Sequence, residues 1–116
     1  ASRASASSPM TGAATAARLR LELSVARASA LRNLEALHTA YLTRREAAAA
    51  FEQEALPSAL ENERLSQRAF EEGELSLPDL LVVRRESAET RLEYLERLRD
   101  AAQTAMLRDA AAGVLR

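Results

Sequence analysis

Glu35 and His38 are the pair of residues whose types and spacing come closest to a metal-binding motif. A Glu-x-x-His step places a carboxylate and an imidazole on one face of a helix, as in the di-iron sites of helical bundles. Such a site needs a second histidine-bearing helix and further facing carboxylates, and this chain has one histidine. We therefore expect His38 to face solvent or a helix interface.

The residue types also give little support for nucleophilic catalysis or for another metal site. Serines are plentiful, but a serine nucleophile needs a neighbouring base and a group that orients it, and a single histidine offers no such arrangement. The absence of cysteine excludes disulfides, thiolate metal sites and cysteine nucleophiles. Met10 and Met106 are too far apart in the chain to indicate a copper(I) site. The sequence therefore predicts a protein that is not an enzyme and that binds neither metal nor cofactor.

Composition favours a thin helical core. Of the 116 residues, 47% are hydrophobic and 28% charged, but only 3% are aromatic, so a core must consist mainly of Leu and Ala. The net charge is −1 without a basic block, which argues against nucleic-acid binding. No apolar run approaches the roughly 18 residues that span a bilayer. A charged set in the second half is expected to form a solvated face with weak ion pairs: Glu89, Glu93, Glu96, Arg97 and Arg99.

A short break between two helix-forming segments carries the strongest local signals. Gly73 can end a helix because glycine enters the left-handed region without steric cost. Ser76 can cap the next helix, Pro78 suits its first turn, and Asp79 favours the positive end of its dipole. Stop and start signals so close together predict an antiparallel hairpin with a tight turn at residues 73–76.

Two unequal helices are predicted on either side of this turn, so the fold class is all-α, a long antiparallel, coiled-coil-like hairpin. The first helix covers residues 13–72 and the second residues 77–112, while residues 1–12 are small, polar and aperiodic, as in a flexible tail. Three- and four-residue steps mark the seam of the first helix at Leu23, Ala30, Leu34, Leu37, Tyr41, Ala48, Phe51 and Ala55. The same steps mark the seam of the second helix at Leu81, Ala88, Leu95, Leu98, Ala102 and Ala105.

Pro57 interrupts the first helix. A proline inside a helix removes one backbone hydrogen bond, clashes with the carbonyl four residues before it and costs roughly 3 kcal/mol. We expect a kink near residues 53–56, because no Gly, Asn or loop-like cluster accompanies the proline. A clean break is the alternative, in which the first helix folds back at Pro57 into a three-helix bundle.

The difference in helix length predicts an overhang. At 1.5 Å per residue the first helix reaches roughly 90 Å and the second roughly 54 Å. Part of the first helix then lacks an intrachain partner, and its apolar stripe is expected to mediate self-association: Leu19, Leu23, Leu31 and Leu34. Another copy, another part of a longer protein, or the folded-back helix could cover this stripe.

The turn and its flanks resemble the second periplasmic hairpin of TolC-like outer-membrane efflux factors, most closely in the heavy-metal and cation efflux branch. The family pattern is an aromatic residue, two residues, glycine, an acidic or polar residue, a short apolar step and Asp-Leu-Leu. The residues that fill these places are Phe70, Gly73, Glu74, Leu75, Ser76, Leu77, Asp79, Leu80 and Leu81. The resemblance covers about residues 13–116, and the family's unequal helices match the predicted overhang.

The resemblance implies transport without chemistry. In this family three subunits form a tunnel across the periplasm and outer membrane. Their hairpin tips meet the helical tips of a periplasmic adaptor, which links the tunnel to an inner-membrane pump. The chain would then be a periplasmic part of an outer-membrane protein in a Gram-negative cell envelope. Its partner-binding residues would be Phe70, Gly73, Glu74, Leu75, Ser76, Leu77 and Asp79.

A second function is compatible with the residues. A coiled-coil scaffold that oligomerises through its Ala and Leu seams would have the same helical periodicity. It would not account for the Gly-Glu-Leu-Ser turn at residues 73–76.

Overall fold

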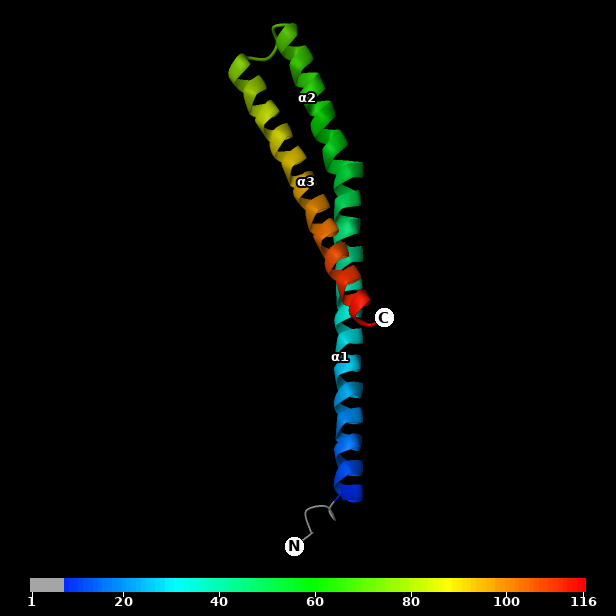
Figure 1. The fold of residues 1–116 in the computed structure, drawn as a ribbon. Coiled ribbons are helices and arrows are strands. Elements are labelled where there is room, and N and C mark those ends of the chain that lie inside the picture. The colour runs from blue at the N-terminus through cyan, green and yellow to red at the C-terminus, as the bar shows by residue number, and fades with distance from the viewer. Residues whose placement is uncertain (1–7) are drawn as a thin grey trace.

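The computed structural model describes residues 8–116, and this part of the chain is helical without any strand (Figure 1). Its elements are α1 (Ser8–Ala50), the π-helical turn η2 (Phe51–Ala55), α2 (Leu56–Glu71) and α3 (Leu77–Val114). Together they form a rod of 104 × 23 × 15 Å. The expected all-α hairpin with a longer first helix is confirmed.

The two arms of the hairpin run antiparallel. After the turn, α3 runs back beside α2 and then along the second half of α1, so the C-terminus lies beside the middle of α1 (Figure 1). The first half of α1 projects beyond it. We call residues 8–30 the overhang.

The helix begins earlier than the sequence predicts. The predicted tail includes residues 8–12, but α1 begins at Ser8. Pro9 explains the difference, because its fixed backbone angle suits a first helical turn and its missing N–H costs no helical hydrogen bond there. Residues 1–7 lie outside the described residues.

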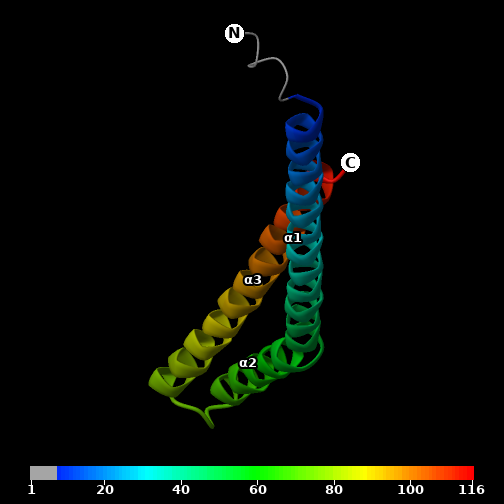
Figure 2. The same cartoon turned by 90° about the horizontal axis from the view of Figure 1, so that it is seen from below.

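Pro57 bends the first arm without breaking it. The helix passes through the π-helical turn η2 and continues as α2, with Pro57 in the first turn of α2. The wider π turn moves the preceding carbonyls away from the proline ring, which would clash with them in a regular α-helix. Figure 2 shows the resulting bend between α1 and α2. The predicted kink is confirmed, and the clean break is wrong.

The seam of the first arm lies where the sequence places it. Of its eight predicted positions only Leu23, in the overhang, is exposed, and Ala48 is fully buried. The spacing of three and four residues therefore identifies the face of α1 that packs against α3.

The predicted seam of α3 is wrong by about one residue. Its predicted positions are exposed except Ala105, which is partly buried. Most side chains that α3 buries or half-buries follow another series with the same steps: Leu80, Val83, Ser87, Thr90, Tyr94, Arg97, Ala101, Thr104, Arg108 and Ala111. The turn decides between the two series, because it directs Leu80, at 2% exposure, beneath the hairpin end. Heptad steps from Leu80 then lead to Ser87, Tyr94 and Ala101.

Candidate functional site

The end of α2 closes with a Schellman motif. Gly73 has φ +77°, the left-handed conformation that the sequence predicts for it. Its N–H donates to the carbonyl of Phe70 at 3.0 Å, and the N–H of Glu74 donates to the carbonyl of Ala69 at 2.8 Å. These bonds satisfy carbonyls that a helix end otherwise leaves free. The turn is therefore a defined structure held by its own backbone.

The start of α3 is capped by Ser76. Its side-chain oxygen accepts a hydrogen bond from the N–H of Asp79 at 3.3 Å, and its carbonyl accepts one from the N–H of Leu80 at 3.0 Å. Asp79 lies in the first turn, where its charge complements the helix dipole. The Schellman motif at Gly73 and the N-cap at Ser76 together confirm the predicted tight turn. They also restrict the path of the chain from α2 to α3.

The predicted tip residues differ in exposure. Gly73, Glu74, Ser76 and Asp79 are exposed, and Leu77 is 53% exposed. Phe70 and Leu75 are partly buried and so belong to the support of the turn as well as to its surface. The most accessible apolar group of the predicted set is Leu77.

Two further apolar residues extend this surface along α3. Leu81 is 55% exposed and Val82 54% exposed, and Leu81 lies one helical turn from Leu77 on the same face. The seam predicted from the sequence includes Leu81, but this residue is exposed. The i, i+4 spacing from Leu77 is the signal that identifies it. We call Gly73, Glu74, Ser76, Leu77 and Leu81 the tip surface.

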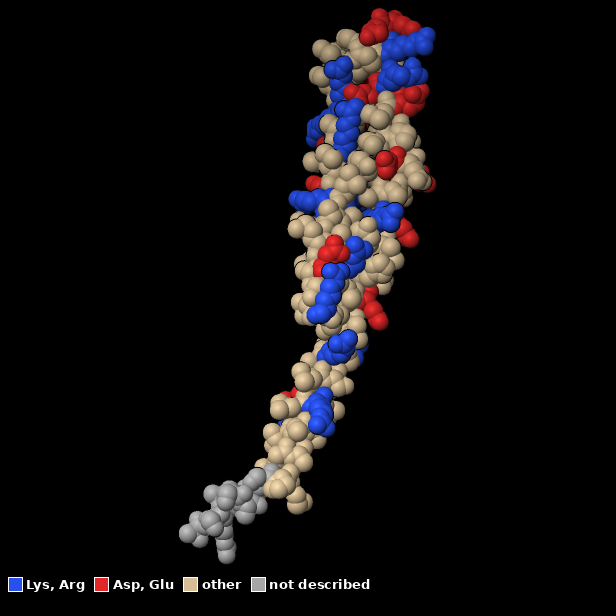
Figure 3. All heavy atoms as spheres, turned by 45° about the vertical axis from the view of Figure 1, so that its right-hand side comes forward, with Lys and Arg blue, Asp and Glu red and all other residues tan. Residues whose placement is uncertain are grey.

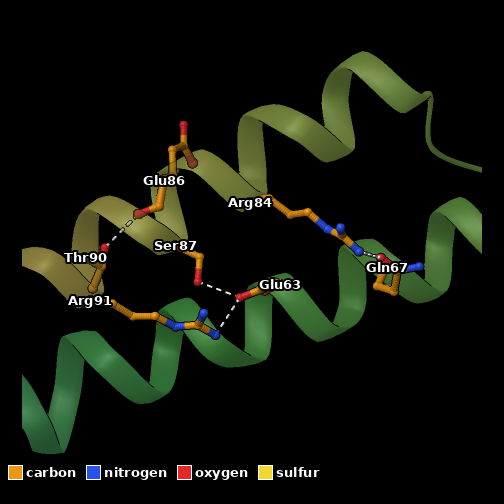
Figure 4. A network of polar contacts seen from close by, with 7 residues as sticks. All are labelled: Glu63, Gln67, Arg84, Glu86, Ser87, Thr90 and Arg91. Carbon is orange, nitrogen blue, oxygen red and sulfur yellow. Dashed lines mark hydrogen bonds and ion pairs between the residues drawn. The ribbon is translucent and has the colours of Figure 1, made fainter.

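A polar network joins α2 and α3 behind the tip surface (Figure 4). The carboxylate of Glu63 accepts hydrogen bonds from the hydroxyl of Ser87 at 2.7 Å and from the guanidinium of Arg91 at 3.0 Å. Nearer the turn, Arg84 donates to the side-chain carbonyl of Gln67. Ser87 is only 2% exposed, so its bond to Glu63 satisfies a buried hydroxyl. These contacts fix the spacing of the two helices that carry the tip.

Long side chains join α3 to α1 and to η2 farther from the tip. Arg44 donates to the hydroxyl of Thr104, which is 1% exposed and donates in turn to the carbonyl of Asp100 at 2.8 Å. The guanidinium of Arg97 lies 4.9 Å from the ring centre of Phe51. Such cation–π contacts add attraction where few apolar side chains are buried.

A second cation–π contact is made by Arg108, whose guanidinium lies 4.3 Å from the ring centre of Tyr41. His38 stacks beside the same ring at a centroid distance of 6.5 Å. Both residues border an open groove of about 580 Å³, which is lined by Leu34, Glu35, His38, Thr39, Arg108 and Ala112. Within residues 8–116, no group of three or more His, Cys, Asp or Glu side chains is arranged to hold a metal ion.

The predicted oligomerisation stripe is divided by the end of α3. Leu19, Leu23 and Leu31 are 54%, 70% and 41% exposed. Leu34 was expected to lack an intrachain partner, but it is partly buried and lines a groove with Arg108 and Ala112. That expectation is wrong because the last turns of α3, at Arg108 and Ala112, reach Leu34 and so lie farther along α1 than predicted.

The charged face of α3 is solvated and forms ion pairs, as the sequence predicts. Arg97 contacts Glu93 at 3.4 Å, Arg85 contacts Glu89 at 3.3 Å, and Arg99 approaches Asp100 to 4.0 Å. Arg97 departs from the prediction, since it is partly buried and belongs to the series through which α3 packs. Pairs of this kind at the surface contribute little to stability.

Among the described residues, no helix combines the length and apolar character that crossing a membrane requires. Comparisons of the chain with protein families, curated proteins and solved structures found no match.

Proposed function

We propose that the chain is a non-catalytic docking hairpin whose tip surface binds the helical tip of a partner protein. The observation that carries this proposal is the exposure of Leu77 and Leu81 beside a glycine turn whose backbone is held by its own hydrogen bonds. A preorganised surface loses little conformational entropy when it binds. The rod behind it, 104 Å long, can present this surface far from the other end of the chain.

The resemblance of residues 70–81 to TolC-like efflux factors identifies the kind of partner in this proposal. The hairpin would form part of the periplasmic α-barrel of an outer-membrane efflux channel. Its tip surface would dock onto a periplasmic adaptor that leads to an inner-membrane pump, with three copies around the tunnel. Glu74 and Asp79 would supply a polar, acidic edge to a small apolar contact.

Substitution of Leu77 by Asp in the protein in its host tests this proposal. The exposed side chain tolerates a charge, so the hairpin should fold, while the unpaired charge should weaken docking at least tenfold. Leu75→Asp should act in the same direction, with some loss of stability because Leu75 is partly buried. Cross-linking to the adaptor and export of heavy-metal cations are the measurements.

Met106→Asp is the matched control, because Met106 is 70% exposed and lies on α3 far from the turn. It should leave cross-linking and export unchanged. Wild-type levels of both in the Leu77→Asp variant would show that the turn is a plain connection between helices.

A self-association module is the second candidate function. The specific observation in its favour is the apolar series on α3 that does not face α1 or α2, with Leu95 59% and Leu98 41% exposed. Large side chains at heptad spacing on a free helix face are typical of coiled-coil assembly.

A further inference from the structure

The rod has opposite charges at its two ends. Residues 8–34 carry four arginines, Arg18, Arg20, Arg27 and Arg32, against the single acid Glu22. Residues 56–96, which form the tip half, carry ten acidic residues against five arginines. On the face shown in Figure 3, most of the acidic side chains lie in the upper part of the rod, with arginines among them, and the lower part shows mainly basic ones.

The charges at each end are in part unpaired. Within the described residues, none of these four arginines forms an ion pair with an acidic side chain of the chain. In the tip half, the carboxylates without such a pair include Glu74, Asp79, Glu86 and Glu96 within the same described range. Both ends can therefore form new ion pairs without breaking existing ones.

Each end also carries an apolar or hollow surface. The overhang exposes leucines on consecutive turns, with Leu19 54% and Leu23 70% exposed. In the tip half, a groove of about 410 Å³ runs between the two arms and is lined mainly by small side chains, among them Ala55, Ser58, Ala59, Val83, Ser87 and Thr90. Small residues at a helix groove allow another helix to approach closely.

We propose that two copies of this chain associate side by side and antiparallel, with the overhang of each copy in the groove of the other's tip half. The basic overhang then meets the acidic tip half twice, through two identical contacts. A twofold arrangement of this kind is closed, so association stops at a dimer.

The lengths of the parts agree with this arrangement. When two rods overlap fully, the twofold axis falls near Tyr41, about halfway between Ser8 and Glu74. Residue 24 of one copy then lies opposite residue 58 of the other, roughly 25 Å from the axis. Ser58 lines the groove, and Leu23 lies next to Ser24 in the overhang. The same register places Arg20 near Glu86, which also lines the groove.

A parallel arrangement lacks this complementarity. It would place the two acidic tip halves together and the two basic overhangs together, and like charges in contact oppose association. The antiparallel dimer rests on the second candidate function, self-association, and is an alternative to the three-copy tunnel, in which all turns lie at one end. It uses the sides of the rod and leaves one turn free at each end.

Cysteine cross-linking tests the orientation directly, because the native chain contains no cysteine. Ser24→Cys and Ser58→Cys are nearly isosteric changes at exposed positions, so both variants should fold. A short bis-maleimide added to an equimolar mixture should join one variant to the other. Ser58→Cys alone is the matched control, and its two thiols should be roughly 50 Å apart and should not react with each other.

Sedimentation equilibrium of the unmodified chain gives the second readout. A dimer, together with cross-linking in the mixture at least tenfold above the Ser58→Cys control, would support the proposal. A monomer at several hundred micromolar would overturn it, and so would equal cross-linking in the control, which indicates parallel rods.

Charge reversal tests what selects the orientation. Arg20→Glu with Arg27→Glu should weaken the dimer at least tenfold at low salt, and so should Glu86→Arg with Glu96→Arg. A mixture of the two double variants should restore dimerisation, because each reversed overhang then meets a reversed tip half. No rescue in the mixture would contradict the charge pairing.

Discussion

Gly73 is the residue on which the geometry of the turn depends most. At φ +77° a side chain with a Cβ atom is strained, although such an atom would meet nothing within 4 Å. Gly73→Val should therefore lower the free energy of unfolding by about 1–2 kcal/mol through the backbone alone. Gly73→Asn should cost less, because Asn tolerates this conformation. Urea denaturation followed by circular dichroism checks both values, and equal stability of the Val variant and the wild type would contradict the turn described here.

Tyr94 gives the hairpin a dependence on alkaline pH. Its partly buried position and the neighbouring carboxylate of Glu52 raise the pKa of Tyr94 above its ordinary value. The folded state therefore favours the neutral phenol. This contribution is complete below the ordinary pKa of about 10 and is lost as the pH rises through the higher folded value.

The melting temperature of the wild type should accordingly fall as the pH rises above about 10. The Tyr94→Phe variant should lose less stability over the same range, because its side chain has no proton to release. The chain contains no lysine, so few other groups titrate there. Identical losses in the two proteins would show that Tyr94 does not cause the dependence.

At the scale of the elements, the rotation of α3 is the feature that most affects what the molecule exposes. Leu80 is 2% exposed and its neighbour Leu81 55% exposed. Leu80→Ala should cost about 2–5 kcal/mol, because it leaves a cavity beneath the turn. Leu81→Ala should change stability by less than about 0.5 kcal/mol. Thermal denaturation at low protein concentration compares the two variants. A larger loss of stability in Leu81→Ala would indicate that α3 packs through the seam that the sequence predicts.

Local signals made the turn and the kink predictable. Gly73, Ser76 and Pro57 act through backbone angles and hydrogen bonds of their own neighbourhood, which a single sequence displays. The rotation of α3 was not predictable in this way, because two series of residues share the same spacing. The series that packs includes Ser87 and Thr104, whose burial depends on partners in the other arm.

Only part of the tip surface was predictable from the sequence. Its turn residues follow from the local signals, whereas the exposure of Leu81 follows only from the rotation of α3. The groove between the two arms and the pairing of Glu63 with Ser87 and Arg91 depend on the register between the arms. A single sequence does not contain that register.

At the scale of the whole molecule, length and mass separate the possible assemblies. A monomer is a rod of 104 Å with a radius of gyration of 28.7 Å. The antiparallel dimer doubles the mass, while its maximum dimension should stay near 104 Å. Small-angle X-ray scattering measures both quantities. A dimer much longer than the monomer would contradict full overlap of the two rods.

The most direct test of the docking function is a titration of the purified chain with the helical hairpin of a periplasmic adaptor. Backbone amide NMR signals should shift for residues 73–82, at the turn and the start of α3, and those of residues 101–112 should stay in place. The Leu77→Asp variant should show no shifts at the same adaptor concentration. Absence of binding by the wild type, or shifts confined to residues outside the tip, would contradict the account.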